Sequence, residues 1–254
     1  MKLAFTGKGG VGKTTTVVLT AELLRRGKKP VFIVDADPDM NVGTLLGFSG
    51  DLPIRPISEM KELIHERTGV KENEPAPFFK MNPRVDDIPE KYSLDVNGIK
   101  LLIMGTIQKG GGGCACPENA FLKSLLSYLM IARDEWVLLD MEAGIEHLGR
   151  GTAIGVDRMV VVVEPNKTSL ETAIRIKKLS RDLGVKNLVA MGNKITSDDE
   201  KEYIIQNLKD IEVTGYIKYS EEIKNLSLGK IKPWDLSDEI IGSIGGLIES
   251  LTAV

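Results

Sequence analysis

GKGGVGKTT, at residues 7–15, is the stretch that decides the fold of this chain. It follows a short apolar run, KLAFT at 2–6, and satisfies the phosphate-loop (P-loop) pattern G-x-x-x-x-G-K-[ST] between an expected strand and an expected helix. Glycines let backbone amides turn inward around a phosphate, and a helix beginning near Lys13 adds the positive end of its dipole. The residues expected to surround the phosphates are Gly9, Gly10, Val11, Gly12, Lys13, Thr14 and Thr15.

Two side chains of this loop carry the expected chemistry. Lys13 should reach the β- and γ-phosphates, and the Thr14 hydroxyl should bind Mg²⁺. The motif therefore predicts ATP or ADP with Mg²⁺ as the ligand.

Further apolar runs follow, with helical stretches between them. Near-continuous Val, Ile and Leu runs indicate strands that are buried on both faces, as in a parallel sheet. We therefore predict an α/β fold, a single P-loop NTPase domain over 1–254, with a mostly parallel sheet flanked by helices on both faces. The runs after 2–6 are 30–37, 99–105, 136–142, 158–165, 187–194 and 211–217.

Two local features refine this outline. Residues 50–98 are rich in Pro, Asp, Glu and Lys, and we interpret them as a less regular insertion with one helix around 58–68. The sequence Thr168-Ser169-Leu170-Glu171 has the pattern of a capping box at a helix start, and Gly184 is a suitable end for that helix.

Lys8 narrows the class of P-loop protein. A lysine directly after the first glycine resembles the signature of the deviant P-loop ATPases, which include the nitrogenase iron protein, MinD, ParA and the arsenite-pump ATPases. The resemblance implies a homodimer in which Lys8 crosses the interface to the nucleotide of the partner, as an arginine finger does elsewhere. Lys8 is thus expected to be catalytic together with Lys13.

Acidic residues follow two of the expected strands. In VDADPD at 34–39, the position suits switch I of this class, and we expect Asp37 to orient the attacking water. Asp35 is expected to bond to the P-loop or to the water shell of the metal, and Asp39 to cap a helix. In LLDMEAG at 138–144, Asp140 is expected to hold Mg²⁺ through water, and Gly144 to offer its amide to the γ-phosphate.

Asn193, in Gly192-Asn193-Lys194, resembles the base-recognition asparagine of these ATPases. Its amide is expected to contact adenine, with an ordinary loop asparagine as the alternative reading. The aspartate of a guanine-specific N-K-x-D motif is missing, which favours ATP over GTP.

Both cysteines of the chain lie in GGGGCACP at 110–117. A disulfide across one intervening residue would be strained, so Cys114 and Cys116 are expected to bind a thiophilic metal. Such a metal prefers about four ligands, and a twofold dimer would bring four thiolates to one ion. An incidental pair of small residues in a loop is the alternative.

The P-loop, VDADPD, the glycine-preceded C-x-C and LLDMEAGIEHLGRGTA together resemble the nickel-site maturation ATPases of carbon monoxide dehydrogenase and acetyl-CoA synthase, the CooC/AcsF group. The resemblance implies a nucleotide- and metal-dependent homodimer with Ni²⁺ or Zn²⁺ at its interface. It also implies a client nickel enzyme, carbon monoxide dehydrogenase or acetyl-CoA synthase. Glu142 stands where MinD has proline, so switch II is expected to act on partners other than those of MinD.

Two other functions stay open. Four thiolates could hold an Fe–S cluster, as in an Fe–S carrier or a nitrogenase iron protein-like reductase, although 141–150 has no cysteine. A MinD- or ParA-type positioning ATPase would use membrane or DNA. No Lys or Arg follows Lys232, and 33 Lys and Arg against 36 Asp and Glu disfavour nucleic acid as a partner. We expect no nucleic acid or membrane partner and a cytoplasmic location, because the apolar start is too short for a signal peptide.

Overall fold

The computed structural model describes residues 1–48, 53–70, 78–105, 116–143, 155–185 and 187–252 of the 254. Its centre is an eight-stranded sheet in the order β3-β4-β2-β5-β1-β6-β7-β8. All neighbouring strands are parallel except β3, which is antiparallel to β4. The strands are β1 Lys2–Thr6, β2 Val31–Asp35, β3 Leu94–Val96, β4 Ile99–Ile103, β5 Trp136–Asp140, β6 Arg158–Val163, β7 Leu188–Ile195 and β8 Glu212–Lys218.

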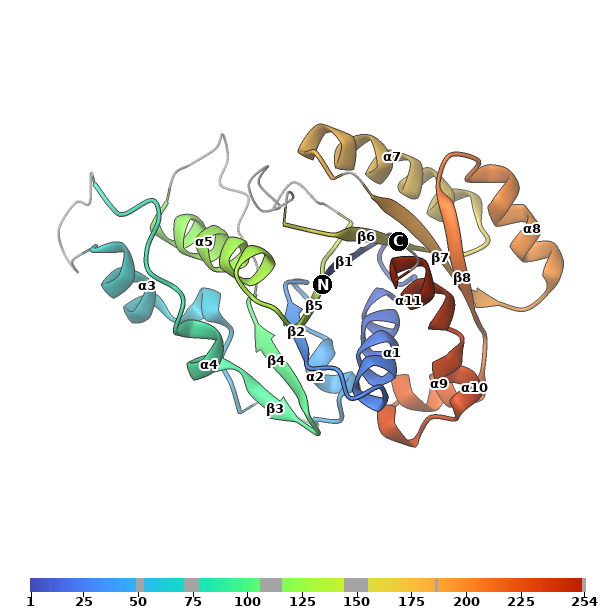
Figure 1. Cartoon of the computed structure of the whole chain (residues 1–254), viewed down its shortest axis with the longest axis horizontal. Helices are drawn as coiled ribbons and strands as arrows, with labels where there is room; N and C mark the ends of the chain where they lie inside the picture. Colours follow the sequence, from blue (N-terminus) through green and yellow to red (C-terminus); the bar gives the residue numbers. More distant parts are fainter. Residues whose placement is uncertain (49–52, 71–77, 106–115, 144–154, 186, 253–254) are drawn as a thin grey trace.

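Helices cover both faces of this sheet (Figure 1). One face carries α3 Lys61–Thr68, α4 Ile88–Tyr92, α5 Pro117–Ile131, α7 Lys167–Leu183 and α8 Asp198–Asn207. The other carries α1 Lys13–Arg26, α2 Val42–Leu45, α9 Glu221–Ser227, α10 Asp238–Gly242 and α11 Gly245–Thr252. The predicted α/β fold is confirmed.

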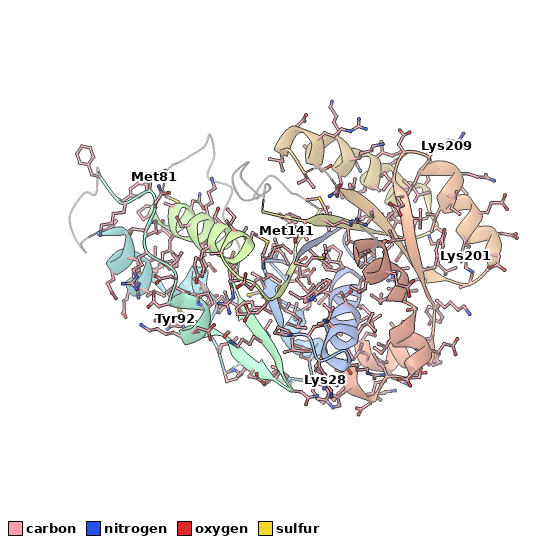
Figure 2. The ribbon with its side chains drawn as sticks, in the orientation of Figure 1. Lys28, Met81, Tyr92, Met141, Lys201 and Lys209 are labelled. Atoms are coloured by element: carbon pink, nitrogen blue, oxygen red, sulfur yellow. The ribbon has the colours of Figure 1, made fainter. Side chains whose placement is uncertain are left out.

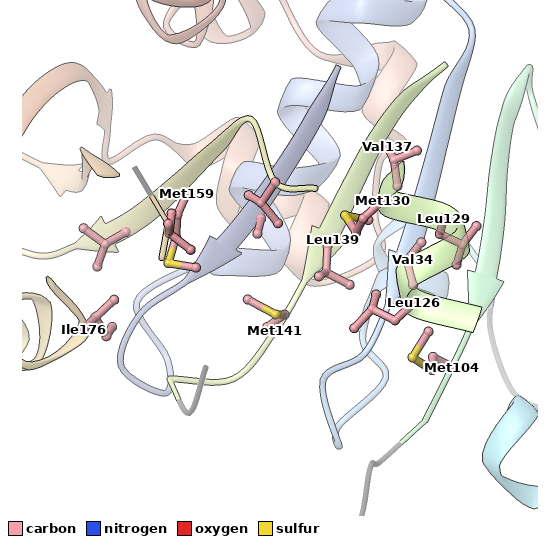
Figure 3. Close-up of a cluster of buried hydrophobic side chains, with 14 of the residues drawn as sticks. Val34, Met104, Leu126, Leu129, Met130, Val137, Leu139, Met141, Met159 and Ile176 are labelled. Atoms are coloured by element: carbon pink, nitrogen blue, oxygen red, sulfur yellow. The ribbon is translucent and has the colours of Figure 1, made fainter. Parts of the chain in front are cut away.

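Alternation along each strand divides the core between the two faces. Phe32 and Val34 of β2 pack toward α5, whereas Val31 and Ile33 pack toward α1. Figure 3 shows the first of these layers, where Leu126, Leu129 and Met130 of α5 face side chains of β2 and β5. Figure 2 shows the charged ends of Lys28, Lys201 and Lys209 at the periphery, while Met141, directly after β5, lies inside. The strands are therefore buried on both sides, as their apolar runs predict.

The insertion at 50–98 is more regular than expected. The single helix expected at 58–68 is divided into a 3₁₀ turn, η1 Ile57–Glu59, and α3, with Met60 in a non-helical conformation between them. The insertion also supplies α4 and the edge strand β3. Asn97 and Gly98 both have positive φ, 53° and 84°, which suits the tight turn that joins β3 to β4.

The start of α7 also differs from the capping-box expectation. Asn166 is the N-cap, and its Oδ1 accepts the Ser169 amide at 3.0 Å. The helix thus begins at Lys167, before Thr168, so Thr168 cannot be the cap. The end is as predicted, since Gly184 terminates the helix with a φ of 84°.

Candidate nucleotide site

The P-loop joins β1, at the middle of the sheet, to α1. Gly7 approaches β6 so closely that a Cβ there would lie 2.5 Å from the Val162 carbonyl oxygen. Gly10 and Gly12 have left-handed φ values of 82° and 91°, and Gly12 is the N-cap of α1. The glycines of the motif therefore serve both close packing and an inward turn of the backbone at the start of a helix.

A pocket of about 290 Å³ opens over this loop. Most of the predicted P-loop residues and Asp37 line it, while Val11 is buried behind the loop. Its wall also includes residues of the β2–α2 connection, of α2 and of α9. The lining residues are Gly9, Gly10, Gly12, Lys13, Thr14, Thr15, Asp37, Asp39, Asn41, Thr44, Leu45 and Ser227. Sequence reasoning missed the last four, and it assigned Asp39 only to a helix cap.

Lys13 and Asp37 face each other in the pocket. The Lys13 Nζ lies 3.5 Å from the Asp37 Oδ2, and both side chains are about nine-tenths buried. The Asp37 Oδ1 accepts the amide of Asp39 at 3.1 Å, which fixes the carboxylate in its turn. The predicted phosphate-binding lysine and the predicted water-orienting aspartate therefore form an ion pair in this structure.

Asp35 is fully buried and braces the loop after β2. Its Oδ1 accepts the Asp37 amide at 3.3 Å, and its Oδ2 accepts the Val42 amide at 3.1 Å. Burial raises the pKa of Asp35 to about 8, with a further contribution from the Asp140 charge, its register partner on β5. Asp35 therefore connects the start of its own loop, at Asp37, to the start of α2, at Val42, and these hydrogen bonds do not involve the P-loop. The alternative expectation, a bond to the water shell of the metal, stays a prediction.

Asp140 ends β5 beside the P-loop. Burial raises the pKa of Asp140 to about 7, and the nearby Thr14 hydroxyl and Lys13 ammonium limit that rise. Neither carboxylate oxygen makes a hydrogen bond of good geometry with a described residue, although both are buried. A buried carboxylate without such a partner next to a hydroxyl oxygen is a donor set that suits Mg²⁺. Thr14 and Asp140 therefore fit the predicted magnesium ion.

Asn193 and Lys194 brace the P-loop from β7. The buried Asn193 donates its amide Nδ2 to the Val11 carbonyl at 2.7 Å. Lys194, at a φ of 59°, donates to the Gly10 carbonyl at 2.8 Å and pairs with Glu164 at 2.5 Å. Asn193 therefore holds the loop in this structure, and its predicted contact with adenine is untested.

Lys8 is exposed at the rim of the site and donates to the Thr168 Oγ1 at 2.8 Å. Cys116 is the N-cap residue of α5 and does not line the nucleotide pocket. It is partly buried and lines a cavity of about 550 Å³ with residues that include Met40, Glu59 and Glu118. Cys114 and Gly144 lie outside the described residues.

No group of three or more His, Cys, Asp and Glu side chains in the described part of the chain is arranged to hold a metal. The predicted nickel or zinc site therefore remains a prediction. Among the same residues, no helix is long and apolar enough to cross a membrane.

Comparison with known proteins bears on the whole chain. Residues 3–233 match the family model described as the CobQ/CobB/MinD/ParA nucleotide binding domain. The carbon monoxide dehydrogenase accessory protein CooC of Rhodospirillum rubrum is 44% identical over 239 residues, which are 93% of this chain and 90% of that protein. An uncharacterized ATP-binding protein of Methanocaldococcus jannaschii is 46% identical over 233 residues, 91% of this chain and 90% of that protein. The resemblance to the deviant P-loop ATPases and the CooC group is confirmed.

Solved structures share the fold at low sequence identity. A chain of the MinC:MinD cell division protein complex of Aquifex aeolicus superposes with a TM-score of 0.70 at 20% identity, covering 100% of this chain and 96% of that one. MinD of Pyrococcus horikoshii, complexed with Mg-ADP, superposes with a TM-score of 0.65 at 15% identity, covering 100% and 97%. The arrangement of strands and helices is therefore that of the MinD fold.

Proposed function

The chain belongs to the CobQ/CobB/MinD/ParA family of nucleotide-binding domains, and from this membership we propose that it is a dimeric ATPase that assists nickel insertion into carbon monoxide dehydrogenase or acetyl-CoA synthase. In this proposal it carries nickel or zinc on Cys114 and Cys116. The observation that supports it best is a P-loop pocket beside the buried Asp140, whose carboxylate makes no hydrogen bond of good geometry with a described residue, in a chain 44% identical to a carbon monoxide dehydrogenase accessory protein.

ATP hydrolysis follows from the groups around the pocket. When a triphosphate enters, Lys13 exchanges its contact with Asp37 for the β- and γ-phosphate oxygens, because the two phosphates together carry more negative charge than one carboxylate. Asp37 is then free to accept a hydrogen bond from a water molecule aligned with the γ-phosphorus. The water oxygen attacks, the bond to the β–γ bridging oxygen breaks, and ADP and phosphate result.

Magnesium would be held by the Thr14 hydroxyl directly and by Asp140 through water. When bound, Mg²⁺ neutralises part of the phosphate charge that builds up as the bond breaks. The burial that raises the pKa of Asp140 also strengthens the attraction of its ionised form for a cation. The Gly144 amide is proposed as a further donor to the γ-phosphate, and Asn193 as a contact to adenine.

Lys8 is proposed to act on the nucleotide of the partner subunit. Its side chain is exposed and extends from the rim of the pocket, so a second chain could receive it. A cation that arrives only in the dimer would link hydrolysis to association. The two chains would also bring four cysteine thiolates together, which is the ligand number that zinc and related soft metals accept.

The first experiment separates the metal site from the nucleotide site. Wild-type protein is expected to bind about half an equivalent of Ni²⁺ or Zn²⁺ per chain, one ion for each twofold dimer. The Cys114→Ser/Cys116→Ser variant should bind none, while its affinity for ATP stays within about twofold. Metal content after dialysis and calorimetric nucleotide titration measure the two properties. Retention of half an equivalent by the double variant would show that the ligand assignment is wrong.

The same preparation distinguishes the rival functions. Iron with acid-labile sulfide in the purified wild-type protein, in place of nickel or zinc, would favour an Fe–S carrier or a nitrogenase iron protein-like reductase. ATP-dependent binding to lipid vesicles or DNA would favour a positioning ATPase.

Linkage gives a second test. If ATP and metal favour the same closed dimer, a non-hydrolysable ATP analogue must tighten nickel binding, and nickel must tighten binding of the analogue by the same factor. Equal nickel affinity with and without the analogue would contradict the coupling.

A further inference from the structure

A series of side-chain contacts starts and ends on the P-loop. Lys8 of the loop contacts the turn between β6 and α7, and Lys194 connects that turn back to the loop. The contacts are Lys8 Nζ to Thr168 Oγ1 at 2.8 Å, Thr168 Oγ1 to Asn166 Oδ1 at 3.0 Å, Asn166 Nδ2 to Glu164 Oε2 at 3.0 Å, Lys194 Nζ to Glu164 Oε1 at 2.5 Å, and Lys194 Nζ to the Gly10 carbonyl at 2.8 Å.

The middle of this series is fixed by the backbone. Asn166 is the N-cap of α7, and its Oδ1 accepts both the Ser169 amide and the Thr168 hydroxyl. Because the Thr168 hydroxyl donates to Asn166, its oxygen lone pairs remain available to accept from Lys8. The turn therefore presents an oriented acceptor to the end of the lysine side chain.

The two lysines of the series are held differently. Lys194 forms an ion pair with Glu164, whereas the partner of Lys8 is a neutral hydroxyl at an exposed position. A neutral acceptor positions the ammonium without neutralising it, and the contact costs little to break. Lys8 is thus held in place but keeps its full charge for an anion.

We propose that Thr168, oriented by Asn166, is a positioning residue that holds Lys8 in a resting position on its own chain until a partner subunit presents its nucleotide. The proposal rests on the proposed function, in which Lys8 contacts the nucleotide across a dimer. Reaching across requires the contact with Thr168 to break. Removing that contact in advance should therefore favour the nucleotide-bound dimer by about two- to tenfold, the range expected for one hydrogen bond.

The test uses Thr168→Val, which keeps the shape of the side chain and removes the hydroxyl, and Thr168→Ser, which keeps the hydroxyl. In the nucleotide-free protein, acetylation of Lys8 by acetic anhydride, followed by mass spectrometry, should be faster in T168V and equal to wild type in T168S. With a non-hydrolysable ATP analogue, the dimer dissociation constant from sedimentation should fall about two- to tenfold in T168V, with T168S again like wild type.

The Lys8→Ala variant tests the role of Lys8 across the dimer interface separately from its resting contact with Thr168. If K8A forms the analogue-dependent dimer as well as wild type does, Lys8 has no role across the interface, and both that part of the proposed function and the resting position are overturned. If K8A weakens the dimer but T168V behaves like wild type or associates more weakly, only the resting position is overturned. Faster acetylation and tighter association in T168V, both restored by T168S, would support it.

Discussion

The nucleotide pocket and the region around Cys116 differ in how much of a site one chain supplies. Around the pocket, Lys13, Thr14, Asp37 and Asp140 converge from three segments at the ends of neighbouring strands, and the P-loop is braced from β7. Around the start of α5, the described chain offers Cys116, while Cys114 lies outside the described residues. The fold thus prepares the nucleotide site within one chain, whereas the metal site remains a proposal that depends on both cysteines and on a second chain.

The largest effect on the function of the nucleotide pocket is expected from a substitution at Asp37. Asp37→Asn should lower the turnover number for ATP by at least about 100-fold, because an amide aligns and activates water less well than a carboxylate. Nucleotide affinity should not fall, since Lys13 and the loop amides stay and Lys13 no longer has to leave the Asp37 carboxylate. Asp39→Asn is the matched control, because Asp39 lines the same pocket but is exposed and unpaired with Lys13. Steady-state phosphate release measures both variants, and equal rates for D37N and D39N would contradict the role of Asp37.

A pH titration tests the burial of Asp35, beneath the loop that follows β2. The raised pKa keeps Asp35 protonated in the folded chain up to about pH 8, whereas the unfolded chain releases this proton near its ordinary value of 3.8. The folded state therefore holds the extra proton between these values, so raising the pH lowers the free energy of unfolding, by up to about 1.4 kcal/mol per pH unit for one group.

Urea denaturation of the nucleotide- and magnesium-free protein between pH 5 and pH 8 measures this slope. Asp35→Asn should reduce it, whereas Asp39→Asn should retain it. Asp140, with a pKa raised to about 7, contributes in the same direction and leaves a residual slope in D35N. An undiminished slope in D35N would show that Asp35 is ionised in the folded chain.

The sequence predicts those parts of the fold that depend on local pattern. The run at 2–6 matches β1 residue for residue, because a strand buried on both faces must be apolar throughout. The edge strand β3 is missed because it spans three residues and lacks such a run, although Asn97-Gly98 is a hairpin signal. At α7, the capping-box pattern of Thr168 and Glu171 predicts the wrong start, because Asn166, two residues earlier, is the N-cap.

The features of the site that the sequence does not predict are contacts between residues far apart in the chain. The hydrogen bonds of Lys8 with Thr168 and of Asn193 with Val11 join residues 160 and 182 positions apart, and no spacing encodes them. Ser227 reaches the pocket from α9 without any motif. The P-loop residues were predictable because one short segment both forms the turn and binds the phosphate. The single-domain extent over 1–254 and the roles of the individual site residues stay predictions.

A smaller effect, at Asn193, would show how the P-loop is held. Asn193→Ala should weaken ATP binding about tenfold, because the Val11 carbonyl loses its partner and the loop loosens. Asn187→Ala is the matched control, since Asn187 makes a similar bond to the Asp157 carbonyl just before β7, at the opposite end of the strand. A calorimetric titration with inorganic tripolyphosphate, which has no base, separates the role of Asn193 in bracing the P-loop from its proposed contact with adenine. An equal loss for both ligands indicates the brace alone, a greater loss for ATP adds the adenine contact, and no loss for either contradicts both.

The smallest effect is expected in the insertion, far from the pocket. Asp87, just before α4, accepts two hydrogen bonds from the Arg67 guanidinium of α3, at 2.9 and 2.8 Å, and one from Lys91. These partners hold the pKa of Asp87 well below its usual range, so its ionised form stabilises the fold above about pH 4. Asp87→Asn should lower the free energy of unfolding by about 1 kcal/mol at pH 7. The neighbouring Asp86 is exposed, and among the described residues its ion-pair partner is the exposed Arg84, so Asp86→Asn should change stability much less than Asp87→Asn does. Neither variant should alter ATP affinity if the insertion and the nucleotide pocket are energetically separate, and a weakened affinity in D87N would show that they are coupled.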